Sequence, residues 1–337
     1  MTRPASLFRS CPSWRWAFFW CLPAVLLLMG ARPASAQPGT SGSFSLLRLD
    51  ASARAAALGG SFAAVDDGDV SALFYNPALL REASHRRVAL SYLNHIGDLN
   101  AGFLAGAYHV EGLGTFGAGL RFLSWGAIEG ANAIGERTGS FGAGDLVLTA
   151  GFARALGPRW RYGVNVHVLY SYIEATEAAA LAADLGVRYR VPSQQLTLAA
   201  TVNHLGRAID SFGPSRNEVP LDVRLGFTKR LRYLPLLLSV TAYNLHETGE
   251  GVPDGSALED VLAHLALGGE VQLTEAFAVR ASYNHRRSED LALQDRLDPA
   301  GLGAGFGLTL GRLGADYAYH SWSSFGGLHW LTLRTSF

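Results

Sequence analysis

The sequence predicts an all-β protein, a 14-stranded antiparallel transmembrane β-barrel with an N-terminal hatch or plug segment. Three observations predict this fold: long segments of alternating apolar and polar residues, the positions of the charges along them, and the alternating lengths of the links between them. After Ala36 no run of 18 apolar residues occurs, so no membrane-spanning helix is expected there.

The clearest alternating segment is WRYGVNVHVLYSYIE, residues 160–174. Its apolar face holds Tyr162, Val164, Val166, Val168, Tyr170 and Tyr172 at period two. A strand of about 11 residues is twice the usual globular length, and tyrosines at both ends of the apolar face are typical of an aromatic girdle. Fourteen such strands are expected near 88–96, 101–110, 115–125, 144–155, 160–173, 179–190, 195–205, 219–230, 236–245, 264–273, 276–285, 301–310, 313–320 and 328–337.

Charges in these segments lie on the phase opposite the apolar one, as they do when the apolar phase faces lipid and the other faces a lumen. Arg154 and Lys229 break this rule near strand ends, where long side chains can reach the interface. The residues that follow the rule are Arg121, Asp184, Arg188, Asp222, Arg224, Glu270, Arg280, Asp316 and Arg334.

The links between the expected strands alternate in length. After the second, fourth, sixth, eighth, tenth and twelfth strands they are brief, whereas four others are long, at about 126–143, 206–218, 246–263 and 286–300. Outer-membrane barrels have short periplasmic turns and longer external loops. We therefore expect a multi-pass outer-membrane protein, surrounded by lipid, with both termini in the periplasm.

The start of the chain predicts export. A basic leader and an apolar run, Ala17–Ala31, precede the small-residue sequence ASA, so residues 1–36 are expected to be a cleaved signal peptide. Cys11 and Cys21 lie within it, so no disulfide or thiolate metal site is expected. The formal net charge of zero gives no support to nucleic-acid binding, and no cofactor or metal motif occurs among the histidines.

Residues 37–87 do not alternate and are expected to form the plug, with residues 88–337 forming the barrel. The plug should contain a short helix ended by Gly59 and Gly60, and a solvated acidic turn, Asp66–Asp69, in which Asp69 caps the next helix. Asn76, Pro77 and Ala78 are expected to be structural, because the helix must stop there and the chain must turn towards the first strand.

The last segment, LHWLTLRTSF, should pair with the first strand, because an open sheet edge in lipid leaves costly unsatisfied backbone groups. A terminal aromatic residue on the lipid phase, Phe337, is expected to be the assembly signal.

The plug sequence SARAAALGGSFAAVDDGDVSALFYNPALL resembles the start of the FadL-like barrels, which have fourteen strands and an N-terminal hatch. Together with LGTFGAGLRFLSWGAIEG, TGSFGAGDLVLTAGFAR, YGVNVHVLYSYIE and LAADLGVRYR, it resembles more closely the PorV/PorQ family of outer-membrane proteins of the type IX secretion system. The resemblance covers nearly the whole chain after residue 36, and it is most specific in the plug and in residues 113–190.

This resemblance implies a non-enzymatic barrel that holds a PorZ-like surface protein and, through it, PorU and PorV, in a complex that attaches cargo to the cell surface. The alternative, implied by the shared fold and hatch, is a FadL-type passive transporter of hydrophobic solutes. The docking surface is expected in the most densely charged long link, at Arg286, Arg287, Glu289, Asp290, Asp295, Arg296 and Asp298.

A third class, an outer-membrane hydrolase, depends only on Asn284, His285 and Ser288. These residues lie within one short segment, where a strand that turns into a loop cannot easily bring a nucleophile to about 3 Å from its base. We therefore predict no catalytic site.

Overall fold

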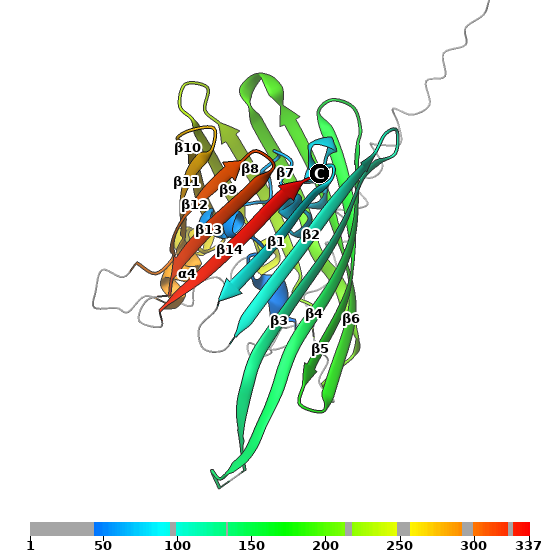
Figure 1. Ribbon diagram of the computed structural model, residues 1–337, viewed down its shortest axis with the longest axis vertical. Coiled ribbons are helices and arrows are strands. Elements are labelled where there is room, and N and C mark those ends of the chain that lie inside the picture. Colours follow the sequence, from blue (N-terminus) through cyan, green and yellow to red (C-terminus); the bar gives the residue numbers. More distant parts are fainter. Residues whose placement is uncertain are drawn as a thin grey trace, which may run out of the picture. The chain divides into compact units, whose positions relative to one another are not determined.

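Fourteen antiparallel strands close into one barrel in the part of the chain that the structure, a computed structural model, describes (Figure 1). The described residues are 44–94, 99–132, 134–212, 218–247, 257–291, 299–322 and 326–337. The predicted fold class and strand number are confirmed. The expected signal peptide, residues 1–36, lies outside the described residues, as do Asp295, Arg296 and Asp298.

Each strand pairs with its neighbours in sequence, and the first strand pairs with the last. The strands are β1 (Arg87–Asn94), β2 (Asn100–Val110), β3 (Gly114–Ala131), β4 (Arg137–Ala155), β5 (Trp160–Ile173), β6 (Thr176–Val191), β7 (Leu196–Asp210), β8 (Asp222–Arg230), β9 (Leu236–Ala242), β10 (Leu265–Gln272), β11 (Phe277–Asn284), β12 (Leu302–Leu310), β13 (Leu313–Ser321) and β14 (Gly327–Ser336).

The barrel closes where β1 and β14 meet. Their register pairs Arg87 with Ser336 and Leu90 with Leu333, so every residue of β1 has a partner on β14. The strand ends at Ser336, and the backbone N–H of Phe337 donates to the Arg86 carbonyl at 3.2 Å. The predicted pairing of the last strand with the first is confirmed; the role of Phe337, which is exposed, as an assembly signal stays a prediction.

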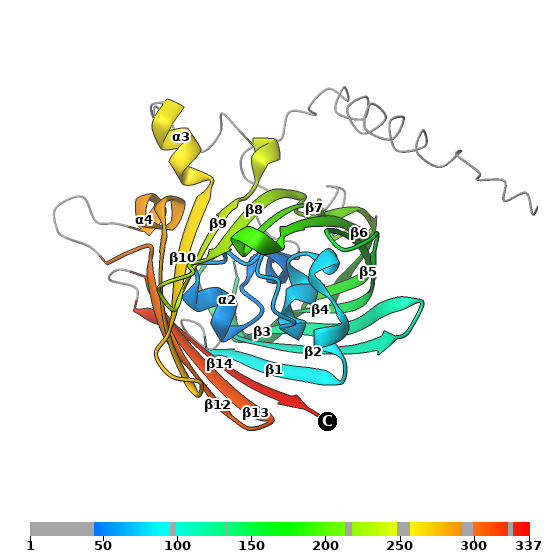
Figure 2. The same cartoon turned by 90° about the horizontal axis from the view of Figure 1, so that it is seen from above.

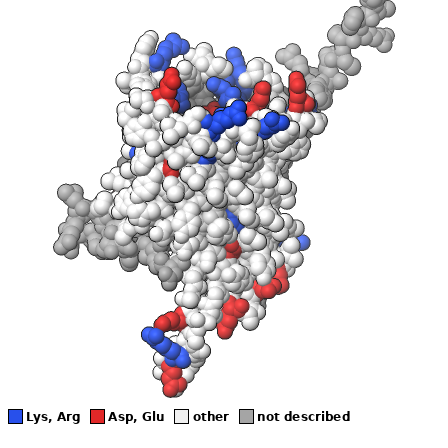
Figure 3. Space-filling model, in the orientation of Figure 1, with Lys and Arg blue, Asp and Glu red and all other residues white. Residues whose placement is uncertain are grey.

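The outer face of the wall is apolar. In β5 the outward residues Val166 and Val168 are exposed, whereas Asn165 and His167 are buried, as the alternation predicts. Tyr170 and Tyr172 lie outward near one end of the strand and Trp160 lies at the other. On the face that Figure 3 shows, charged side chains gather towards the two ends, and the middle of the wall carries few. This is the surface that a lipid bilayer requires.

The links that follow the even-numbered strands are all brief and lie at the end of the barrel that contains Phe337, which we call the short-link end (Figure 1). The opposite end, which we call the long-link end, carries the long β7–β8, β9–β10 and β11–β12 links together with the brief β5–β6 turn, residues 174–175. The assignment of the short-link end to the periplasm stays a prediction. At the long-link end are η6 (Leu245–Glu247), α3 (Ala257–Ala263) and α4 (His285–Leu291); η5 (Pro192–Gln194) lies in a short link. None of the described helices is long and apolar enough to cross a bilayer.

One predicted long link is wrong. Residues 126–143 are largely strand, because β3 and β4 continue as a paired hairpin of 18 and 19 residues. The register shifts between Ser124 and Ala127, where Gly126 adopts a positive φ of 69°. The glycine-rich extension is exposed on both faces and so lacks the alternation by which a strand is recognised in a sequence.

The plug lies inside the ring of strands (Figure 2). It contains η1 (Ser45–Arg48), α2 (Ala53–Ala57), η2 (Val70–Phe74), η3 (Pro77–Leu79) and η4 (Glu82–Ser84), all of them one turn or little more. Most of its backbone is therefore irregular, and its polar groups need partners other than a helix or a sheet.

Candidate functional site: the plugged lumen

Inward-facing glycines let the wall approach the plug. A Cβ atom built on Gly163 of β5 would lie 2.5 Å from backbone atoms of Pro77 and Ala78, which no real side chain tolerates. Plug atoms would lie within 3.0 Å of such a Cβ around the ring as well: backbone atoms at Gly226 of β8 and Gly268 of β10, and side-chain atoms at Gly117 and Gly119 of β3, Gly151 of β4, Gly186 of β6 and Gly305 of β12. On most sides of the barrel, the backbone of the wall therefore packs directly against the plug.

Polar side chains of the wall satisfy the irregular backbone of the plug. Trp330 Nε1 donates to the Asp50 carbonyl at 3.0 Å, and Asn165 Nδ2 donates to the Leu73 carbonyl at 2.8 Å. Arg161 Nη1 donates to the Leu80 carbonyl at 2.8 Å. Each bond removes the cost of burying an unpaired carbonyl oxygen.

The predicted structural motifs of the plug lie in this contact region. Gly59 and Gly60 follow α2 with φ of 68° and 79°, and the Gly60 N–H donates to the Ala55 carbonyl, as in a glycine-ended helix. Asn76 is fully buried: its Oδ1 accepts the Ala78 N–H at 3.0 Å and its Nδ2 donates to the Ala63 carbonyl at 3.1 Å. Asn76 thus joins two plug segments, immediately before Pro77 opens η3.

A buried chain of alternating charges joins the plug to the wall at the short-link end. Arg54 of α2 contacts Asp67 at 2.6 Å and Glu270 of β10 at 2.8 Å. Arg280 of β11 contacts Glu270 at 2.7 Å and Asp316 of β13 at 2.8 Å. Burial raises the pKa of Asp67, but the Arg54 guanidinium more than offsets this, so that pKa lies below its ordinary value.

The expectation of a solvated acidic turn at Asp66–Asp69 is wrong for Asp66 and Asp69, whereas the side chain of Asp67 is 31% exposed. The side chains of Asp66 and Asp69 are 1% and 2% exposed, because arginines meet them inside the barrel. Asp66 contacts Arg188 of β6 at 3.1 Å, and Asp69 contacts Arg54 at 3.3 Å. Asp69 also caps η2, as predicted, by accepting the Ser71 N–H.

A second polar group surrounds Asp184 of β6. His167 Nε2 lies 2.7 Å from Asp184, and Asn165 Nδ2 donates to the same carboxylate at 2.8 Å. Thr149 Oγ1 lies 2.9 Å from His167 Nδ1. These side chains are at most 5% exposed, so the group resembles a catalytic triad in its pairings but presents no exposed nucleophile.

The lumen at the long-link end is apolar around η1, and charged pairs lie elsewhere at this end, such as Asp222 with Arg224 and Asp50 with Arg287. Leu93 is the next-to-last residue of β1, and Leu123 pairs with Ala101 at the start of β2, so both lie near this end. One buried apolar cluster runs through the whole plug, and we call the part of it around η1 the apolar chamber. This part contains Leu93, Phe103, Leu123, Val147, Leu169 and Trp330 of the wall, with Phe44, Leu46 and Leu47 from the plug.

The residues expected to dock a partner are only partly described. Arg287 Nη1 lies 2.6 Å from His320 Nδ1, and Arg287 Nη2 lies 3.6 Å from Asp50 of the plug, so this arginine is engaged within the barrel. Arg286 contacts Glu247 at 3.5 Å, and Glu289 is exposed. Asn284 Oδ1 accepts the Arg287 N–H and so caps the start of α4. Asn284, which belongs to the Asn284, His285 and Ser288 set, therefore has a structural role.

Solved structures of outer-membrane hydrocarbon channels resemble this fold. A TodX deltaS2S3 mutant, a monoaromatic hydrocarbon channel, is 15% identical with a TM-score of 0.59 and covers 85% of this chain and 99% of its own. The toluene transporter TbuX of Ralstonia pickettii is 15% identical with a TM-score of 0.56, over 85% and 98%. The CymD monoaromatic hydrocarbon channel is 11% identical with a TM-score of 0.55, over 85% and 97%.

At these identities the likeness shows the fold alone, a FadL-like closed β-barrel. These neighbours are named as channels and transporters, not as enzymes. No family model matches the chain, and no curated protein matches it in sequence.

The glycine contacts predict a position-dependent effect of a single methyl group. Gly163→Ala should destabilise the protein by about 1–3 kcal/mol, because the new Cβ overlaps plug backbone that cannot move aside. Gly106→Ala, on the outer face of β2 with its nearest contact at 3.6 Å, should be neutral or stabilising by about 0.4–1 kcal/mol. Urea unfolding in detergent micelles measures both, and equal effects would show that the wall does not grip the plug.

The charge chain predicts a large cost for removing its central carboxylate. Glu270→Gln should destabilise the barrel by about 3–5 kcal/mol, because Arg54 and Arg280 both lose their shared buried partner. Glu129→Gln removes an exposed pair with Arg137 and should cost less than about 1 kcal/mol. The same unfolding assay applies, and a Glu270→Gln effect as small as that of the control would contradict the network's role.

Proposed function

We propose that this protein is a passive transporter of hydrophobic solutes across the outer membrane. The observation that carries the proposal is the apolar chamber at the long-link end. Apolar side chains line it, and its contents are the plug's own Phe44, Leu46 and Leu47, each at most 3% exposed. If η1 moved aside, the space left would have an apolar lining, and an apolar cavity stays dry and takes up solutes such as benzene.

The chamber is filled by a segment under strain. Phe44 has a φ of 61°, a left-handed conformation that is an outlier for a bulky residue and costs about 1–3 kcal/mol. Its ring is nevertheless fully buried. A segment that is apolar and strained is the part of the plug that a solute can replace at the lowest cost.

The wall is irregular next to the chamber. The shift in the β3–β4 ladder lies between Ser124 and Ala127, directly after the chamber residue Leu123. Bulges of this kind occur beside functional sites, where they interrupt strand pairing. The resemblance in fold to named hydrocarbon channels agrees with this proposal.

Toluene uptake by cells tests the proposal. Cells with the intact protein in their outer membrane should take up toluene faster than cells without it. Leu46→Asp should abolish the difference, because a charge in the chamber opposes an apolar solute. Phe44→Ala should increase uptake, because it enlarges the chamber.

Leu58→Ala is the matched control, since Leu58 is an equally buried plug residue of the same cluster that packs against Gly268 of β10 and not around η1. It should leave uptake near that of the intact protein. Equal uptake by cells with and without the protein would contradict transport.

The second candidate is the docking of a PorZ-like surface protein, and one observation favours it. The β3–β4 hairpin extends well beyond the other strands at the long-link end (Figure 1), and Ile134 near its tip is 79% exposed. A solute channel has no need for such an extension, whereas a paired hairpin with two free faces is a ready surface for a protein partner.

A trimmed hairpin tests docking. Replacing residues 129–140 by an Asn-Gly turn keeps the pair Ile128–Phe141 and removes only the extension. If docking occurs there, a PorZ-like protein co-purifies with the tagged intact barrel and is lost with the trimmed one, while heat-modifiable migration on gels shows both barrels folded. Retention of the partner by the trimmed barrel, or no partner on the intact one, would remove this candidate.

A further inference from the structure

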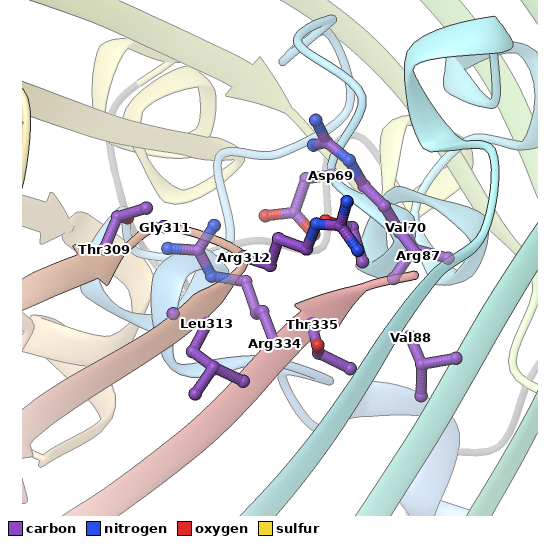
Figure 4. Close-up of a pocket in the computed structure, with 12 residues that line it drawn as sticks. Asp69, Val70, Arg87, Val88, Thr309, Gly311, Arg312, Leu313, Arg334 and Thr335 are labelled. Atoms are coloured by element: carbon purple, nitrogen blue, oxygen red, sulfur yellow. The ribbon is translucent and has the colours of Figure 1, made fainter.

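Two adjoining cavities open between the plug and the wall at the short-link end. Their volumes are about 120 and 190 Å³, and they share Asp69, Arg87, Thr309 and Arg334 in their linings. We call them together the arginine cavity, because six guanidinium groups line it, those of Arg54, Arg87, Arg230, Arg280, Arg312 and Arg334. Figure 4 shows three of these arginines around the smaller cavity, with Asp69 among them.

The carboxylates that line this cavity already accept hydrogen bonds from other groups of the protein. Both oxygens of Glu270 accept hydrogen bonds from Arg54. Asp69 accepts one from Arg54 and one from the Ser71 N–H, and Asp67 accepts from Arg54 and from the Asp69 N–H. A cation entering the cavity would therefore find every lining carboxylate engaged.

Several of the guanidinium groups, in contrast, have no carboxylate partner among the described residues. Arg230 and Arg312 donate no side-chain hydrogen bond within the described part of the chain, and Arg87 donates there to a carbonyl, that of Gly68, and to no carboxylate. The whole chain carries 28 basic and 28 acidic residues, so this excess of donors is local.

The wall is shaped to hold the arginines at this place. A Cβ on Gly307 of β12 would lie 2.7 Å from Arg280 Nη2, and one on Gly314 of β13 would lie 3.0 Å from Arg334 Cζ. Both guanidinium groups thus lie flat against bare backbone. The remaining arginines come from four other places: Arg54 from α2, Arg87 from the start of β1, Arg230 from the end of β8 and Arg312 from the β12–β13 turn.

We propose that the arginine cavity binds a phosphate group, either free in solution or on the headgroup of a lipid in the adjacent leaflet. Guanidinium donors form charge-assisted hydrogen bonds with phosphate oxygens, and donors that arrive from several directions suit a tetrahedral group. Compared with about 30 Å³ of liquid volume for one water, the larger cavity has room for such a group. The proposal does not depend on solute transport, because the cavity lies at the opposite end of the lumen from the apolar chamber.

Binding to the intact protein in detergent micelles tests the proposal in two arms. Calorimetric titration with inorganic phosphate, at constant ionic strength maintained with chloride, detects the free anion. Native mass spectrometry of the protein in micelles doped with phosphatidylglycerol detects the lipid. Saturable binding is expected in at least one arm, and the arm in which it occurs identifies the source of the phosphate.

Arg230→Gln and Arg312→Gln should each weaken this binding about tenfold, as expected for the loss of one charge-assisted hydrogen bond. Arg232→Gln is the control: Arg232 is exposed at the same end of the barrel, outside the cavity, and should leave binding unchanged. Heat-modifiable migration shows that each variant is folded. The proposal is overturned if the intact protein binds neither ligand, or if all three variants bind as the intact protein does.

Discussion

The structure depends on the burial of an irregular peptide segment inside a barrel that has little room for it. A plug with so few helical turns carries many backbone N–H and C=O groups that cannot pair among themselves, and each costs free energy if it is left unpaired. The wall meets this requirement with its inward polar side chains, as Asn165 does for Leu73 and Trp330 for Asp50. At other positions the wall residue is a glycine, as at Gly163, so that the wall backbone can lie directly against the plug backbone. The inward-facing residues of the wall are therefore not simply polar: at these positions they fit the particular plug segment that they contact.

The lumen is divided by chemistry along its length. Ion pairs hold the plug at both ends, through Arg54 and Glu270 at the short-link end and through Asp50 and Arg287 at the long-link end. The long-link end has in addition an apolar region around Phe44 and Leu169. The two ends do not differ in fold, since the same strands run through both. The difference lies in the side chains alone, which form the apolar chamber at one end and the arginine cavity at the other.

The sequence predicted the wall far better than it predicted the contents of the lumen. Alternation and the phase of the charges determine which residues face lipid, and both are local properties of one strand, as in β5. The partners of an inward charge are not local: Glu270 meets Arg54, which lies 216 residues away. Asp66 illustrates the error that follows, because a run of acidic residues beside a glycine is usually solvated, and only its arginine partners on distant elements bury it here. The apolar chamber could not be predicted for a related reason. Leu169 and Leu123 are buried apolar residues at inward-facing positions, where alternation predicts polar residues.

The contacts between plug and wall limit the ways in which a solute could pass in the proposed transport. Expelling the plug would break the buried charge chain at Arg54 and expose the backbone that Gly163 and Gly268 now cover, and the loss of one buried pair alone costs about 3–5 kcal/mol. Moving only η1 breaks no charge pair among the described residues, and it relieves the left-handed strain at Phe44. A solute in the apolar chamber also replaces the contacts that Leu46 and Leu47 lose. For the proposed transport, entry of a solute by a local rearrangement at the long-link end therefore costs less than expulsion of the plug, and it leaves the arginine cavity at the other end intact.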